Sequence, residues 1–181
     1  QIYHGGGNSY IKNATGFLSV QGDEVLLRSS SDEKFVHCVG NDRVELYYDN
    51  VKTFQTKSNG VIVQGTEGQN AELLLYADEG DDDADKWRLK VDTNGQFEIN
   101  NYAAGSYEKN IECNGNGNVE LYYDNSKKLE TNSNGIKVTG STYHQVDGQG
   151  VLIGASNDLF IYHDGTNSHI NNDTGQIRTN S

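Results

Sequence analysis

The sequence predicts an all-β protein built from repeats, and three observations lead to this fold class. Gly and Asn together make up 42 of the 181 residues, and both disfavour helix interiors and favour tight turns. Short segments alternate between apolar and polar residues, and one long segment occurs twice. No stretch carries apolar residues at helical spacing over three turns. We therefore expect short strands joined by hairpin turns.

Period-two alternation marks the individual strands. The clearest segments are Trp87–Val91, Phe97–Ile99, Val119–Tyr123 and Ile136–Val138. Turn residues such as Asn-Gly and Asp-Gly separate them, because the central positions of a tight hairpin turn need positive φ. We expect positive φ at Gly60, Gly135 and Gly175, and tight turns at Asn50 after Asp49 and at Asn125 after Asp124.

An internal repeat organises the chain. Val44–Gly65 and Val119–Gly140 are identical at 14 of 22 positions, and the match extends to 20 of 35 between 31–65 and 106–140. Ile2–Gly16 matches Ile161–Gly175 at 10 of 15 positions. The predicted organisation is a partial repeat at 1–30, copy 1 at 31–65, an inserted β unit with an acidic loop and the Trp87 strand at 66–105, copy 2 at 106–140, and a repeat at 141–181 that resembles 1–16.

The supply of apolar residues is too small for a well-packed globule. Leu, Ile, Val and Phe account for 40 of 181 residues, close to the level found in disordered chains. Three parallel chains around one axis would need only one apolar face per strand. We therefore expect an elongated, intertwined homotrimer. The alternative is a single-chain β-solenoid, although its repeats are usually 20–30 residues long. The absence of Met suggests a fragment or a processed product.

The alternation also predicts which face is buried. Glu120 is costly to bury without a partner, so Glu120 and Tyr122 should face water. The opposite sets should face the partner chains: Val119, Leu121 and Tyr123; Val44, Leu46 and Tyr48; Trp87, Leu89 and Val91. On this interpretation Leu121→Asp prevents trimer formation and Glu120→Lys is nearly silent.

Charge and hydropathy exclude several classes of partner. A net charge of −12 and a pI near 4.7 disfavour nucleic acid and anionic lipid surfaces. The longest apolar runs are Leu73–Tyr76 and Val151–Ile153, too short for membrane insertion or for the core of a signal peptide.

The acidic run 78–85 is the strongest charge feature. Asp81, Asp83, Asp85 and Asp92 have spacings similar to those of a calcium loop. Lys86 stands where such a loop needs Gly, and no Glu closes it. We interpret the run as a solvated hairpin loop, we expect no dedicated metal site, and we leave open whether the loop binds divalent cations.

Neither cysteines nor histidines form a catalytic pattern. Cys38 and Cys113 are equivalent in the repeat, and we expect half-buried thiols, with interchain disulfides as the alternative. His4 and His163 are equivalent strand-end residues; His37 aligns with Glu112, His169 aligns with Tyr10, and His144 lies in an unassigned stretch. Because no nucleophile or phosphate-loop motif is present, we expect no enzyme, no catalytic residue and no cofactor.

The remaining motifs have simple explanations. The segments Asn13–Thr15 and Asn172–Thr174 match the N-glycosylation pattern, but they lie at equivalent turns and are explained by turn chemistry. Tyrosines recur at matching positions: Tyr47, Tyr122 and Tyr162, and Tyr48 and Tyr123. Outward tyrosines could contact host polysaccharide, while cross-strand packing is the simpler interpretation.

Three segments resemble a known class of proteins. VELYYDNSKKLETNSNGIKVTG (119–140), IYHDGTNSHI (161–170) and DADKWRLKVDTNGQFEI (83–99) are similar to repeats in tail-fibre and related virion proteins of tailed bacteriophages, especially phages of marine bacteria. Gly5–Gly7 departs from the Asp-Gly-Thr of the C-terminal copy, and Tyr143–Gly154 fits neither unit.

The resemblance implies a trimeric structural segment of a tail fibre, acting as a rod in host attachment. It would lie in the virion appendage, extracellular after assembly in the host cytoplasm. Its implied partners are its own copies, other virion or tail proteins, and a host surface polysaccharide or receptor. The alternatives are a bacterial cell-surface adhesin and a polysaccharide-degrading tailspike.

Overall fold

The computed structural model describes residues 2–178 and confirms the all-β fold class. Within these residues the strands form four antiparallel sheets, none of which closes into a barrel. The helical elements of this part are two single 3₁₀ turns, η1 (Asp78–Gly80) and η2 (Asp83–Asp85). The chain divides into two compact units, one ending at Ile136 and the other beginning at Lys137. Each unit is described by itself.

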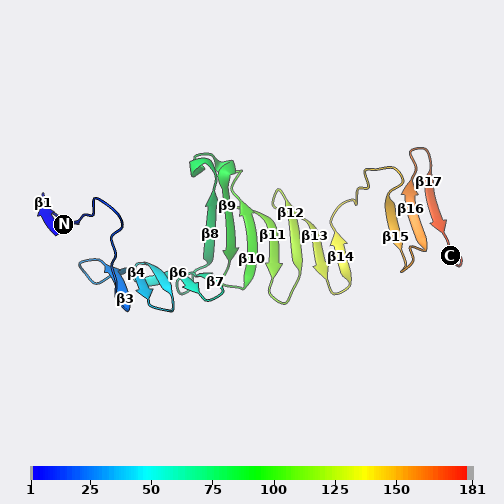
Figure 1. Ribbon diagram of the computed structural model, residues 1–181. Helices are drawn as coiled ribbons and strands as arrows, with labels where there is room; N and C mark the ends of the chain where they lie inside the picture. The colour runs from blue at the N-terminus through cyan, green and yellow to red at the C-terminus, as the bar shows by residue number, and fades with distance from the viewer. Residues whose placement is uncertain (1, 179–181) are drawn as a thin grey trace. The chain divides into compact units, whose positions relative to one another are not determined.

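The first unit contains three sheets (Figure 1). A hairpin consists of β1 (Ile2–Gly5) and β2 (Asn8–Ile11). A five-stranded sheet consists of β3 (Glu24–Arg28), β4 (Lys34–Val39), β5 (Val44–Tyr48), β6 (Val51–Lys57) and β7 (Gly60–Val63). A seven-stranded sheet consists of β8 (Ala71–Tyr76), β9 (Lys86–Val91), β10 (Gln96–Asn101), β11 (Glu108–Asn114), β12 (Val119–Tyr123), β13 (Ser126–Asn132) and β14 (Gly135–Val138), the last of which spans the boundary between the units.

The second unit contains one three-stranded sheet. Its strands are β15 (Gly150–Ile153), β16 (Leu159–His163) and β17 (Ser168–Asn172). The aromatic rings on one face of this sheet stack along and across the strands. Phe160 lies 4.3 Å from Tyr162, and Tyr162 lies 4.7 Å from His169, measured between ring centroids.

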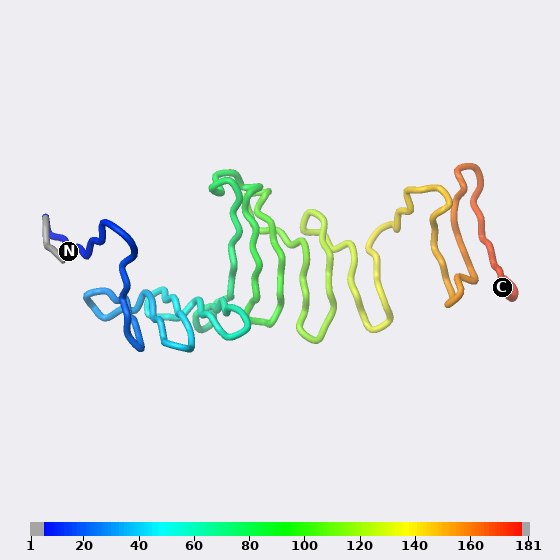
Figure 2. Tube along the Cα trace, in the orientation of Figure 1, coloured from blue at the N-terminus to red at the C-terminus, as the bar shows by residue number. Residues whose placement is uncertain are grey.

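Every sheet is a meander. The spatial order of the strands follows their order in the sequence in all four sheets, and the chain can be followed back and forth through consecutive hairpins in Figure 2. No described residue belongs to a helix long and apolar enough to cross a membrane.

The expected turn chemistry is confirmed. Asp49 and Asn50 both have positive φ, 50° and 59°, and Asp124 and Asn125 repeat this with 50° and 52°. The Asn side chains also secure the neighbouring strand, because Oδ1 of Asn50 accepts a 2.8 Å hydrogen bond from the backbone N–H of Lys34. Gly60, Gly135 and Gly175 have φ of 152°, 128° and 72°, a region that L side chains rarely adopt.

The register of the strands builds two equivalent five-strand modules. We define module 1 as β3–β7 and module 2 as β10–β14. Residues directly opposite each other across strands share a face, and one apolar row in module 1 is Leu27, Val36, Leu46, Phe54 and Val63. The matching row in module 2 is Ile99, Ile111, Leu121 and Leu129. A bulge falls at the same place in both, after Leu46 and after Leu121.

The two faces of the seven-stranded sheet differ in chemistry. In the seven-stranded sheet the row Leu73, Leu89, Ile99, Ile111, Leu121, Leu129 lies on one face, and the row Glu72, Lys90, Glu98, Glu112, Glu120, Glu130 lies on the other. Alternation therefore separates the residues as the sequence predicts. Among the described residues no apolar side chain is fully buried.

The expectation that Glu120 faces open water is wrong. Glu120 is only 8 % exposed, whereas Val119, Leu121 and Tyr123 on the opposite face are 38 %, 40 % and 74 % exposed. Long polar neighbours cause this reversal: Tyr122 and Lys127 lie over Glu120 and bond to it. A carboxylate held in this way is buried with partners, which avoids the desolvation cost on which the expectation rested.

Candidate functional site

A prominent feature of the first unit is the mainly apolar side of its two larger sheets, which we call the apolar face; one charged residue, Glu108, shares this side through its register opposite Asn101. In the seven-stranded sheet its exposed members are Leu73, Leu75, Trp87, Val91, Phe97, Val119, Leu121 and Tyr123, with 37–74 % of each residue accessible. In module 1 the exposed members include Leu27, Val44, Leu46 and Tyr48. Such a contiguous apolar surface marks an interaction site.

The size of this face is comparable to one side of a stable interface. If the full surface of a residue of this class is about 200 Å², the eight residues of the seven-stranded sheet leave roughly 700 Å² of apolar surface accessible to water. One partner in a standard protein–protein interface contributes about 800 Å². The seven-stranded sheet alone can therefore form such an interface.

The opposite face is held together by carboxylates that are almost completely enclosed. In module 1, Glu45 is 3 % exposed. It accepts hydrogen bonds from the hydroxyl of Tyr47 at 2.6 Å, from Nε of Arg43 at 2.7 Å and from Nζ of Lys52 at 3.1 Å. The ring of His37 bridges Glu45 and Glu24, with 3.1 Å to each carboxylate.

Module 2 repeats this arrangement around Glu120. Tyr122 donates its hydroxyl to Glu120, and Nζ of Lys127 lies 3.0 Å from the same carboxylate. Asn118 replaces Arg43 as a further donor. Sequence reasoning missed this site, although the repeat carries the signal: Glu, Tyr two residues later and Lys seven residues later are identical in both copies.

The hydrogen bonds shift the pKa values of these groups in opposite directions. The hydrogen bond from Tyr47, with further help from Arg43, Lys52 and His37, holds the pKa of Glu45 well below its ordinary value. The hydroxyl of Tyr122 likewise lowers the pKa of Glu120. In return, burial and the Glu120 carboxylate raise the pKa of Tyr122 to about 12. Both partners therefore keep the protonation states that their hydrogen bond needs.

A third carboxylate joins the hairpin β8–β9 to module 2. Burial raises the pKa of Glu98, but hydrogen bonds from Lys90 and Asn100 outweigh this and lower it overall. Nζ of Lys90 is 2.8 Å from Glu98, and Nζ of Lys109 is 3.4 Å from it. In the part of the chain that the structure describes, no buried side-chain polar atom is left without a partner.

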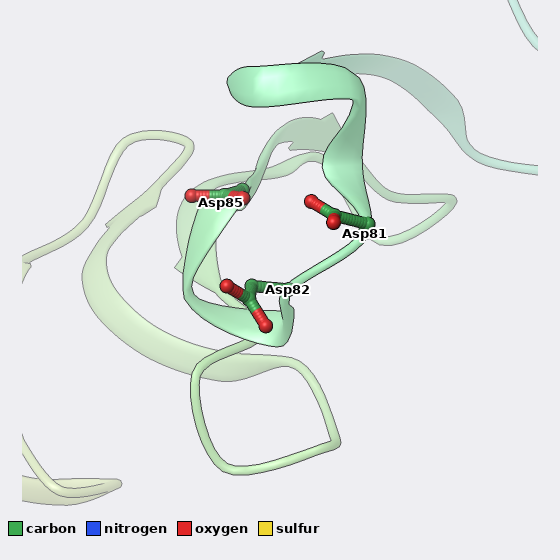
Figure 3. Close-up of side chains that lie close together, drawn as sticks. All are labelled: Asp81, Asp82 and Asp85. Carbon is green, nitrogen blue, oxygen red and sulfur yellow. The ribbon is translucent and has the colours of Figure 1, made fainter.

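The acidic loop gathers three carboxylates, shown in Figure 3. Ligand atoms of Asp81, Asp82 and Asp85 lie within 4.8 Å of one another. The sequence spacing pointed to a different set that included Asp83 and Asp92. In the structure Asp83 forms an ion pair with Lys86 at 3.0 Å and does not join the three gathered carboxylates. Asp92 lies in the β9–β10 turn, where it accepts hydrogen bonds from the backbone N–H groups of Asn94 and Gln96. The three gathered carboxylates are exposed or half-exposed.

The cysteines and histidines are placed as structural residues. Cys38 and Cys113 are free, half-buried thiols, and their register opposite Val44 and Val119 puts both on the apolar face. His163 accepts a 3.0 Å hydrogen bond from the backbone N–H of Gly165 at the end of β16.

The remaining histidines are His169, His144 and His4. His169 bonds to Asp164 at 2.6 Å, and the backbone N–H groups of Asn167 and Thr166, together with His169, lower the pKa of that aspartate. His144 is exposed between strands. The side chain of His4 lies outside the described residues.

The candidate glycosylation asparagines and two of the candidate sugar-binding tyrosines are held by hydrogen bonds within the chain. Asn13 accepts a hydrogen bond from the backbone N–H of Thr15, and Asn172 donates to the backbone carbonyl of Thr174, as turn residues do. Tyr47 and Tyr122 donate their hydroxyl groups to glutamate carboxylates on the face opposite the apolar face. Tyr48 and Tyr123 are 75 % and 74 % exposed at the edge of the apolar face.

Comparisons of the chain with family models, with curated proteins and with solved structures give no match. The fold and the two faces of the sheets are therefore the basis for a functional proposal.

Proposed function

We propose that this chain is a structural segment of a tail fibre or related appendage of a tailed bacteriophage. In this proposal three copies assemble into a rod that takes part in host attachment. The single observation that carries the proposal is the uncovered apolar face, which is present in both modules while no described apolar side chain is buried. The resemblance of the repeats to tail-fibre proteins supports the type of assembly.

The energetics of the sheets support self-association. An isolated open sheet with one wet apolar face lacks the main favourable contribution to folding. At about 25 cal/mol per Å², covering the roughly 700 Å² of the seven-stranded sheet would contribute about 17 kcal/mol per chain as an upper value. This is of the order of the net stability of a whole domain. Assembly and stability are therefore coupled.

Three copies around one axis cover every apolar face with a cyclic, closed arrangement. The charged face of each sheet, with its enclosed carboxylates, then stays outside. Two copies packed face to face would also cover the apolar surfaces, and the resemblance to tail-fibre repeats favours three.

The proposed role is non-catalytic. A glycosidase needs a carboxylic acid with a raised pKa beside a second carboxylate. The enclosed carboxylates Glu45, Glu98 and Glu120 have lowered pKa values and are held by cations or tyrosine. They are therefore suited to holding the sheet together and not to donating a proton.

The test is the mass of the purified chain by light scattering, together with its thermal melting. We expect a particle of three times 19.9 kDa that loses its folded structure when it dissociates. Leu121→Asp would place a charge on each apolar face and should abolish the trimer.

The matched control is Lys128→Asp, which introduces the same side chain at the exposed extra residue of the β12–β13 bulge, and it should stay trimeric. A stable folded monomer, or a trimer that tolerates Leu121→Asp, would contradict the proposal. Release of sugar from bacterial polysaccharide by the purified chain would contradict the non-catalytic role.

A further inference from the structure

The repeat creates a problem of alignment between copies. Module 1 and module 2 present the same apolar rows in the same register: Val25, Cys38 and Val44 in one correspond to Phe97, Cys113 and Val119 in the other. A copy displaced by one module would therefore still find a matching apolar surface. Since a displaced contact does not close on itself, it would lead to open-ended growth.

One part of the apolar face occurs only once among the described sheets. The hairpin β8–β9 adds two strands to the edge of module 2, and module 1 has no counterpart before β3. It adds Leu73, Leu75 and Trp87 to the apolar face, with 45 %, 51 % and 42 % of each residue exposed. Leu73 is opposite Leu89 and Leu75 is opposite Trp87, so the four side chains form one patch.

We infer that this hairpin patch sets the alignment between copies of the chain, which associate in register through their apolar faces; the inference rests on the proposed function. Only an aligned copy covers the hairpin patch with an identical patch. A copy displaced by one module leaves the patch in water, and it forfeits the burial of two leucines and the tryptophan.

The occupant of the apolar face is a second copy of this chain for two reasons. A partner that covers both modules must itself present two apolar surfaces separated by the same 75-residue interval, and this chain does so. The accessible apolar area of the seven-stranded sheet, roughly 700 Å², also matches what one partner contributes to a stable interface.

The native cysteines report the alignment directly. Cys38 and Cys113 lie at equivalent positions on the apolar face of modules 1 and 2. Aligned copies bring Cys38 near Cys38 and Cys113 near Cys113. Displaced copies bring Cys38 of one chain near Cys113 of another.

The experiment uses Cys38→Ser and Cys113→Ser, each alone and co-expressed, with a short bis-maleimide and mass spectrometry of the linked peptides. A link between Cys38 and Cys113 in the co-expressed sample must join two chains. We expect each single variant to link to itself and the mixed link to be absent. Leu75→Ser combined with Trp87→Ser should raise the mixed link at least about tenfold, because half-burial of these two side chains is worth more than a factor of ten in an equilibrium constant.

Leu74→Ser is the matched control, because Leu74 is 46 % exposed on the same strand but faces the opposite side, paired with Arg88. It should leave the mixed link absent. Mixed links in the co-expressed sample without further substitutions, a trimer whose thiols do not link to their own counterparts, or no response to the double variant would overturn the inference. A monomer of 19.9 kDa without links would instead refute the proposed function on which the inference rests.

Discussion

Replacing Glu120 tests whether the charged face holds the sheet together. Glu120 is 8 % exposed and bonds to Tyr122, Lys127 and Asn118. Glu120→Gln keeps the size of the side chain but removes the charge. Glu120→Lys goes further, because it places a second ammonium group beside Lys127 and leaves the hydroxyl of Tyr122 without its carboxylate acceptor.

The magnitude follows from the number of bonds that are weakened. A hydrogen bond to a charged group contributes about 1.5–3 kcal/mol, and removing one partner of a buried ion pair costs about 3–5 kcal/mol. Lys127 keeps Glu130 as a second partner, which reduces the loss. We therefore expect Glu120→Gln to cost about 2 kcal/mol and Glu120→Lys at least about 3 kcal/mol.

The assay is chemical and thermal unfolding at a fixed chain concentration, since the stability of an oligomer depends on concentration. Glu45→Gln in module 1 should show a similar loss, because Glu45 has the equivalent partners Tyr47 and Lys52. Glu67→Gln in the exposed turn before β8 should be neutral. If Glu120→Lys melts with the parent chain, the enclosed carboxylates do not stabilise the sheet.

Four further predictions concern pH and backbone geometry. The lowered pKa values of Glu45, Glu98 and Glu120 mean that the folded chain binds fewer protons than the unfolded chain, so stability should fall as pH drops below the ordinary value of 4.5; a flat acid limb in a pH series of melting curves would contradict this. The raised pKa of Tyr122 contributes stability below pH 10 that should be lost as pH rises to about 12, and Tyr122→Phe should weaken that alkaline loss. Gly135→Val should cost at least about 1 kcal/mol because φ is 128° there, and Gly150→Ala should disrupt the β15–β16 pairing, since its Cβ would lie 1.9 Å from the carbonyl oxygen of Ile161; nuclear magnetic resonance of the β15–β17 amides would show whether that pairing survives.

Local signals in the sequence predict the clearest strands and the tight turns, although they leave unassigned the stretch Tyr143–Gly154, which contains β15. The Asp-Asn and Asn-Gly turns depend on the conformations that these residues adopt by themselves, so Asn50, Asn125 and Gly135 behave as predicted. The separation of Val119 and Leu121 from Glu120 follows equally from alternation. These features involve only residues near each other in the chain.

Alternation could not show which of the two faces of the sheet is the more buried. Whether Glu120 is wet depends on which side chains of the neighbouring strand lie over it, and this is set by the bulge that brings Lys127 opposite Tyr122. The bulge has no strong signature in composition. The same applies to the acidic loop, where the fold of η1 and η2 brings Asp82 to Asp81 and Asp85 and directs Asp83 to Lys86.

The meander topology has a consequence for how such a chain changes over evolutionary time. Each strand bonds only to the strands directly before and after it in the sequence, so a hairpin can be inserted or deleted without rethreading any other segment. The hairpin β8–β9 illustrates this, because it extends the sheet beyond β10 while module 2 keeps the register of module 1. Duplication of a gene segment that encodes one hairpin therefore lengthens the sheet by a complete pair of strands, and the new pair can fold from contacts that are local in the chain.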